Sequence, residues 1–121
     1  MKLIFLVPVL LAATAKVHAQ ACLIESDDDH EPIRLCQENM SIPQDLFETS
    51  FCQPDIPDRS FHIQSVETCP AGYYGICEGA RAQGVGYQQS IHYYSNADDA
   101  PVLKAYCEKI SQGRWVESAA E

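Results

Sequence analysis

Six cysteines are the residues of this 121-residue chain whose type and number point most directly to chemistry. They are Cys22, Cys36, Cys52, Cys69, Cys77 and Cys107. No two of them have the Cys-x-x-Cys spacing that binds zinc or exchanges thiols, so we expect neither a metal nor a cofactor. In an exported chain of this size, an even number of cysteines predicts disulfides that constrain the unfolded chain. The pairing stays open, because six cysteines allow many connectivities.

The first segment of the chain predicts export. Lys2 precedes an apolar run over residues 3–13, and small residues end at Ala19, which is the pattern of a secretory signal peptide. The run is shorter than the roughly 20 apolar residues that span a bilayer, so we expect no membrane insertion. The sequence therefore predicts a signal peptide over 1–19 and a single disulfide-rich secreted domain over 20–121.

Acidic residues dominate the charge of the chain, with 17 Asp and Glu against 8 Lys and Arg and a formal net charge of −9. Removal of the signal peptide also removes Lys2 and Lys16, which makes the mature chain more acidic still. A surface of this kind repels phosphate backbones, and no stretch concentrates basic residues. We therefore expect no nucleic-acid partner.

The histidines and carboxylates do not form a recognisable catalytic motif. A Gly-x-Ser-x-Gly nucleophile elbow is missing, and the cysteines are expected to be used in disulfides. A small secreted ribonuclease is the strongest enzyme alternative, and His62, His92, Glu67 and Arg81 could supply its acid, base and phosphate-binding groups. The acidic surface opposes an RNA substrate. We expect the protein not to be an enzyme.

Two polar segments carry weaker patterns. Residues 22–31 crowd acidic side chains around His30 without the spacing of a calcium loop, which favours a solvated acidic loop. Asn39 begins an Asn-x-Ser sequon, which predicts N-glycosylation on the surface.

The periodicity of the chain predicts an α+β fold, in which a small antiparallel sheet stapled by disulfides packs on one main C-terminal helix. Expected strands are 33–37, 46–52, 60–66 and 85–94, and glycines with aromatics over 69–79 indicate a tight turn beside a short strand. The last strand or hydrophobic clasp is expected at Trp115 and Val116.

The expected helix has the clearest start and end. Asp98 and Asp99 offer an N-cap, Pro101 suits the first turn, and Gly113 suits the end. Its apolar face is expected to be buried, and Cys107 on that face would tie the helix to the sheet. The face consists of Val102, Leu103, Tyr106, Cys107 and Ile110.

Tyrosines are more numerous than a small core needs, which points to recognition. Core filling explains Tyr87, Tyr93 and Tyr106. The residues expected to form an exposed partner-binding face are Tyr74, Gln88, His92 and Tyr94. Strand 85–94 could alternatively lie at a sheet edge and pair with a partner's strand.

The signal peptide, the scattered cysteines and the short acidic body together resemble the small cysteine-rich secreted effectors of plant-pathogenic fungi, of the avirulence and secreted-in-xylem types. Residues 79–115 also resemble the killer-toxin-like α/β sandwiches that several effectors share. This second resemblance rests on the tyrosine-rich strand, the Asn-Ala-Asp-Asp helix start at Asn96, the pair Tyr106 and Cys107, and the closing Gly-Arg-Trp. Those relatives have a cysteine near the final strand, where this chain has Trp115, so their disulfide pattern is not transferred.

The resemblance implies secretion into the apoplast, with translocation into host cells as a further option. It implies that the protein binds a host plant protein or a second secreted fungal effector, promotes infection or suppresses immunity, and is recognised by a resistance protein in some hosts. A secreted toxin or enzyme inhibitor is the alternative, ahead of the ribonuclease.

Overall fold

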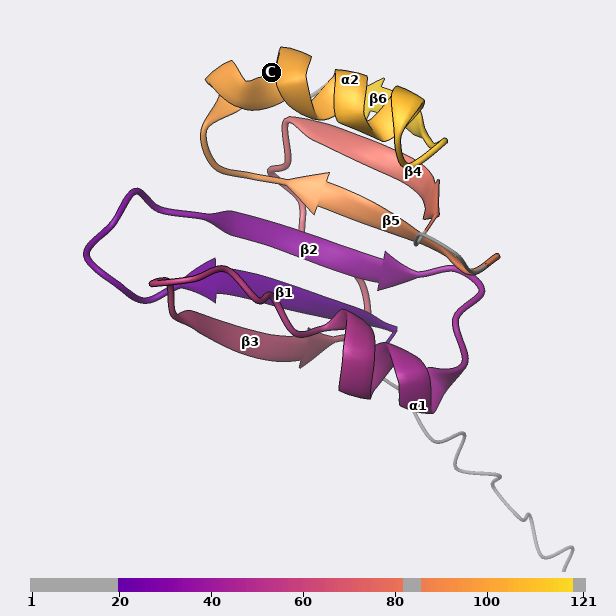
Figure 1. Ribbon diagram of the computed structural model, residues 1–121, viewed down its shortest axis with the longest axis horizontal. Coiled ribbons are helices and arrows are strands. Elements are labelled where there is room, and N and C mark those ends of the chain that lie inside the picture. Colours follow the sequence, from indigo (N-terminus) through magenta and orange to yellow (C-terminus); the bar gives the residue numbers. More distant parts are fainter. Residues whose placement is uncertain (1–19, 82–85, 119–121) are drawn as a thin grey trace, which may run out of the picture.

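The computed structural model describes residues 20–81 and 86–118 (Figure 1). The predicted signal peptide lies outside these residues. Within the two described ranges, no helix is long and apolar enough to cross a membrane.

An antiparallel sheet of six strands forms the body of the protein, with the strand order β3-β1-β2-β5-β4-β6. The predicted α+β class, with disulfides and one main C-terminal helix, is confirmed. The elements in chain order are β1 (Ala21–Ser26), β2 (Arg34–Asn39), α1 (Gln44–Leu46), η1 (Phe47–Phe51), β3 (Phe61–Val66), β4 (Gly75–Arg81), β5 (Gln88–Tyr93), η2 (Ala97–Asp99), α2 (Ala100–Lys109) and β6 (Arg114–Glu117).

Both helical segments cover the same face of the sheet, here called the front face. Residues opposite one another in neighbouring strands point to the same face. One such row crosses four strands and consists of Cys22, Gln37, Ile91 and Cys77. Cys22 is bonded to Cys52, just after η1, and Cys77 is bonded to Cys107 in α2. Two disulfides therefore hold one helix each on the front face (Figure 1).

A long connection covers the opposite side, here called the back face. The adjacent row of opposed residues consists of Leu23, Cys36, His92 and Ile76. Cys36 is bonded to Cys69, which lies in the connection 67–74 between β3 and β4. Because β1, β2 and β5 separate those two strands in the sheet, the connection has to cross the back face. The third disulfide holds it there.

Several predicted strands are confirmed. The expected segments 33–37 and 60–66 correspond to β2 and β3, and Trp115 and Val116 lie in β6. The expected strand 85–94 corresponds to β5, although residue 85 lies outside the described ranges. It is not an edge strand, however, because β5 lies between β2 and β4.

The prediction of an acidic loop over 22–31 is wrong in its first half. Residues 21–26 form β1, which lies between β3 and β2, and Ala21, Cys22, Leu23 and Ile24 are all buried. A strand buried on both faces shows no polar alternation, so the following run of acidic residues obscured it.

The prediction of a strand over 46–52 is also wrong, because this segment is helical in α1 and η1. Phe47 is 1% exposed and packs with Cys22, Ile24, Ile42 and Cys52 in the core under these two helical turns. The short apolar run could equally suit a strand or a helix, and contact with the sheet decided between them.

The C-terminal helix is present but differs in three details. Asp99 occupies the N-cap position without a side-chain capping bond, while Pro101 lies in the first turn as expected. The helix ends at Lys109, before Gly113, and Gln112 adopts the left-handed conformation with φ 55°. Of the predicted buried face, Cys107 is 2% exposed and ties α2 to β4, whereas Val102, Tyr106 and Ile110 are exposed.

Candidate partner-binding surfaces

The residues predicted to form one exposed face lie in different parts of the protein. Tyr74 packs against the cluster under α2 that contains Cys77 and Cys107. Tyr94 instead packs against the back-face cluster around Cys36. A single surface that contains both tyrosines is therefore not formed, and their part in partner binding stays a prediction.

His92 is buried, so the prediction that it is exposed is wrong. His92 is 8% exposed, because β5 lies inside the sheet and the connection 67–74 covers the back face. The ring of Tyr73 lies edge-on to the imidazole, with the ring centroids 4.9 Å apart. Burial lowers the pKa of His92, although Glu38 and Glu78 act in the opposite direction. The side chain is therefore expected to be neutral.

Tyr94 anchors the back-face connection. Its hydroxyl donates a hydrogen bond of 2.7 Å to the carbonyl oxygen of Pro70. The guanidinium carbon of Arg34 lies 4.7 Å from the centre of the tyrosine ring, which is a cation–π distance. Burial raises the pKa of Tyr94 to about 12. These contacts give Tyr94 a role in stabilising the fold.

Tyr74 lines a hollow on the front face, between the start of α2 and the sheet. The hollow has a volume of about 230 Å³, and its walls include Tyr93, Leu103 and Ile56. The Tyr74 hydroxyl donates to the carbonyl oxygen of Asn96 over 3.3 Å, and burial raises its pKa. The fourth predicted residue, Gln88, is half-buried at the start of β5.

Asn39 closes a turn at the end of β2. Its side-chain oxygen accepts from the Ile42 N–H, and its amide nitrogen donates to the Ile42 carbonyl oxygen, both over 2.7 Å. A glycosylated amide keeps one N–H, which could still make the second bond. The geometry is thus compatible with glycosylation, which stays a prediction.

The side chains that a ribonuclease would need are not assembled into one site. His62 lies on β3 and His92 on β5, with two strands between them. At about 4.8 Å per strand the two backbones are roughly 14 Å apart. Glu67 follows β3, and Arg81 ends β4. In residues 20–81 and 86–118 there is also no group of three or more His, Cys, Asp or Glu side chains that could hold a metal ion.

An apolar stripe lies on the exposed side of α2 and its C-cap residue, and consists of Val102, Tyr106 and Ile110. These residues are 71%, 57% and 51% exposed, respectively. Their spacing of four residues places them next to one another on the helix surface. Contiguous exposed apolar residues of this kind commonly mark interaction sites.

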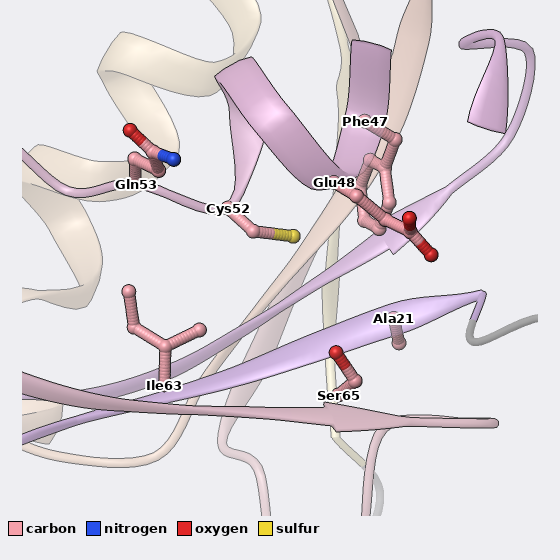
Figure 2. Close-up of a pocket in the computed structure, with 7 residues that line it drawn as sticks. All are labelled: Ala21, Phe47, Glu48, Cys52, Gln53, Ile63 and Ser65. Atoms are coloured by element: carbon pink, nitrogen blue, oxygen red, sulfur yellow. The ribbon is translucent and has the colours of Figure 1, made fainter. Parts of the chain in front are cut away.

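A groove separates η1 from β3, as Figure 2 shows. Glu48, Cys52 and Gln53 approach it from the helical side, and Ile63 and Ser65 approach it from β3. The groove has a volume of about 260 Å³. Phe47 and Ala21 complete its lining.

Neither surface is evident from the sequence. The helix pattern predicts a buried face that includes the apolar stripe, because the pattern does not show how wide the buried face is. The groove depends on the helical turn at 47–51, which was predicted as a strand. The sequence also offers no sign that residues 61–66 form an edge strand, because edge strands normally carry charged side chains and this segment contains no Asp, Glu, Lys or Arg.

Comparison with known proteins leaves the resemblance without further support. No family model matches the chain, and neither a curated protein nor a solved structure matches it.

Proposed function

We propose that the protein is a secreted effector without catalytic activity, which binds a host plant protein or a second secreted fungal protein through the apolar stripe of α2. Three disulfides in a chain of this size are compatible with export. The observation that carries the proposal is the exposure of Val102, Tyr106 and Ile110 on one rigidly held helix.

The stripe has the composition expected of the centre of an interface. Tyrosine is enriched among residues that dominate binding energies, and here Tyr106 lies between two aliphatic side chains. Full burial of one large apolar side chain contributes about 1.5–3 kcal/mol. Lys109 lies on the same helix, three residues after Tyr106, and could supply part of the polar rim that surrounds such a centre.

The helix that carries the stripe is already ordered. Cys107 ties its middle to β4, and Leu103 and Ala100 pack on the front-face core. A rigid binding surface loses little conformational entropy when it meets a partner. The stripe therefore combines exposed apolar area with preorganisation.

The test is affinity capture with the oxidised mature protein from plant tissue and from fungal culture filtrate. The stripe variant carries Val102→Ser, Tyr106→Ser and Ile110→Ser. The matched control carries Lys104→Ser, Ala105→Ser and Glu108→Ser on the same helix. Near-ultraviolet circular dichroism establishes that both variants keep the fold.

We expect a protein that is retained by the wild type and by the control but not by the stripe variant, and that rebinds when purified. In leaves that express the secreted protein, the wild type and the control should suppress defence responses, and the stripe variant should not. The proposal is wrong if all three forms retain the same proteins, or if the wild type retains none in repeated captures.

A further inference from the structure

The free edge of β3 lacks the usual protection against strand pairing. Edge strands of natural sheets normally carry charged side chains, proline or bulges that prevent another strand from pairing with them. β3 contains no charged residue of the Asp, Glu, Lys or Arg type, and Ile63 is 39% exposed. At the other edge of the sheet, β6 begins with Arg114 and ends with Glu117.

The backbone groups available at this edge follow from the alternation of hydrogen bonds. The N–H of Asp27 donates to the carbonyl oxygen of Ser60, one step beyond the opposed pair Ser26 and Phe61. Hydrogen-bonded and non-bonded pairs alternate along an antiparallel ladder. The backbone groups of Phe61, Ile63 and Ser65 therefore point away from β1, toward the free edge.

The side chains of these same three residues lie on the front face. Ile63 is opposite Ile24 and Ser65 is opposite Cys22, both of which belong to the front face. Ile63 and Ser65 line the groove under η1 (Figure 2). A strand added to this edge would place every second side chain on the side of the sheet where the groove lies.

The groove also indicates which side chains suit it. Its walls include Phe47, Cys52 and Ile63, and Glu48 is the one charged residue among the described residues that line it. Glu48 lies toward the Ser65 end, and Ile63 lies toward the other end (Figure 2). An apolar side chain fits near Ile63, and a basic side chain fits near Glu48.

We propose that the β3 edge binds an extended peptide segment of a partner, which adds an antiparallel strand and places a basic side chain opposite Ser65 and an apolar side chain opposite Ile63. Antiparallel pairing continues the arrangement of the whole sheet and is the more stable form per residue. In this direction the basic residue precedes the apolar one by two positions. The site is separate from the apolar stripe of α2 and does not depend on it.

The experiment uses the oxidised mature protein and the synthetic peptide acetyl-TKTLTVT-amide as the probe. Amide hydrogen exchange is followed by NMR at low ionic strength. The expected result is slower exchange of the free-edge amides of Ile63 and Ser65 when the peptide is added. Exchange of the Gln64 amide, which faces β1, should stay the same. This alternating pattern distinguishes strand addition from binding elsewhere.

Two further peptides test the chemistry of the occupant. The reversed peptide acetyl-TVTLTKT-amide has the same composition and should bind more weakly, since its basic side chain falls away from Glu48. In the peptide acetyl-TETLTVT-amide, a carboxylate replaces the ammonium group, and we expect weaker binding as well. Glu48→Gln should reduce affinity for the lysine peptide about two- to fivefold, the range of an exposed ion pair.

A proline variant tests the backbone contribution directly. Ser65→Pro removes an outward N–H while leaving the pairing with β1 and the Ile63 side chain, and it should abolish protection of the Ile63 amide by the peptide. Glu117→Pro is the matched control on β6, because the N–H of Ser118 donates to Tyr74 and the alternation then points the Glu117 N–H outward. This control should bind like the wild type.

Three results would overturn the proposal. The first is the absence of protection at millimolar peptide, and the second is equal binding of the lysine and glutamate peptides. The third is protection of Ile63 and Ser65 that grows with protein concentration alone, which would assign the edge to a second copy of the chain. None of them bears on the stripe of α2, so the proposed function is tested separately.

Discussion

The ring of Tyr73 stands edge-on against the buried imidazole of His92, with 4.9 Å between the ring centroids. Tyr73 belongs to the connection that crosses the back face, and His92 belongs to an inner strand of the sheet. The contact therefore joins the connection to the sheet near the disulfide between Cys36 and Cys69. Because the imidazole of His92 is buried there, its protonation is unfavourable in the folded protein.

His92 should make the folded protein sensitive to mild acid. Burial lowers its pKa from the ordinary value of 6.5, so below that pH the unfolded chain takes up a proton more readily than the folded protein. Its contribution to stability is complete above pH 6.5 and is lost as the pH falls below this value and through the lowered pKa of the folded protein. We expect the melting temperature to fall less between about pH 7.5 and about pH 5.5 in His92→Leu than in the wild type.

The control for this prediction is His62→Leu, because His62 is exposed on β3. This variant should show the same fall in melting temperature as the wild type. An equal fall in all three proteins would show that His92 does not cause the acid sensitivity.

Asp28 should contribute to stability at neutral pH and lose that contribution in strong acid. Its carboxylate accepts hydrogen bonds from Arg59 Nε and Nη2 over 2.8 and 3.1 Å and from the Ser60 N–H over 2.9 Å. These bonds hold the pKa of Asp28 well below its ordinary value of 3.8. Because the unfolded carboxyl binds protons first, the contribution is present above about pH 4 and declines as the pH falls below it.

The matching experiment compares Asp28→Asn with Asp29→Asn, whose side chain is exposed. Asp28→Asn should lower the melting temperature at pH 7. Between about pH 4 and about pH 2, its melting temperature should fall less than that of the wild type. Similar melting curves for the two variants would contradict this role for Asp28.

Gly113 is expected to be required for the approach of β6 to the disulfide of α2. A Cβ atom at this position would lie 2.7 Å from Cys77 Sγ and 2.8 Å from the Glu78 carbonyl oxygen. Gly113→Ala should therefore cost about 1–3 kcal/mol, the usual range for overpacking. Gly86→Ala is the control, since nothing lies within 4 Å of a Cβ atom there. Urea unfolding measures both, and equal midpoints would contradict the close approach.

The disulfides should contribute similarly to global stability but differently to α2. They join residues 30, 33 and 30 positions apart, so loop closure predicts roughly 3–4 kcal/mol for each. The double variant Cys77→Ala and Cys107→Ala should also release α2 and speed amide exchange in its last turns. Removal of Cys36 and Cys69 should leave those amides protected. Equal exchange in α2 for both variants would show that packing alone holds the helix.

The fold class could be predicted from the sequence. The signals for it, which are the alternation of strands and the residues that begin and end a helix, depend only on residues close together in the chain. Residues 60–66 alternate clearly and form β3, and the pattern after Asp98 does form a helix. β1 was missed because it is buried on both faces and therefore lacks alternation. The helical turn at 47–51 was mistaken for a strand because a short apolar run suits both.

The candidate surfaces could not be derived from local patterns. Whether Tyr106 or Tyr93 fills the core depends on how α2 lies across the sheet, and Tyr106 proves to be 57% exposed. Burial of His92 follows from the crossing of the connection 67–74, which only the strand order determines. The pairing of six cysteines likewise depends on which rows of the sheet face the helices.

Photo-crosslinking from the centre of the apolar stripe is the most direct test of partner binding through α2. A benzoylphenylalanine at position 106 replaces Tyr106, and the control carries it at position 104 on the same helix. The proteins are irradiated in infected plant tissue and purified under denaturing conditions. We expect one discrete adduct with a host or fungal protein from position 106, and much less of it from position 104. Identical adducts from both positions, or no adduct from position 106, would contradict binding through the stripe.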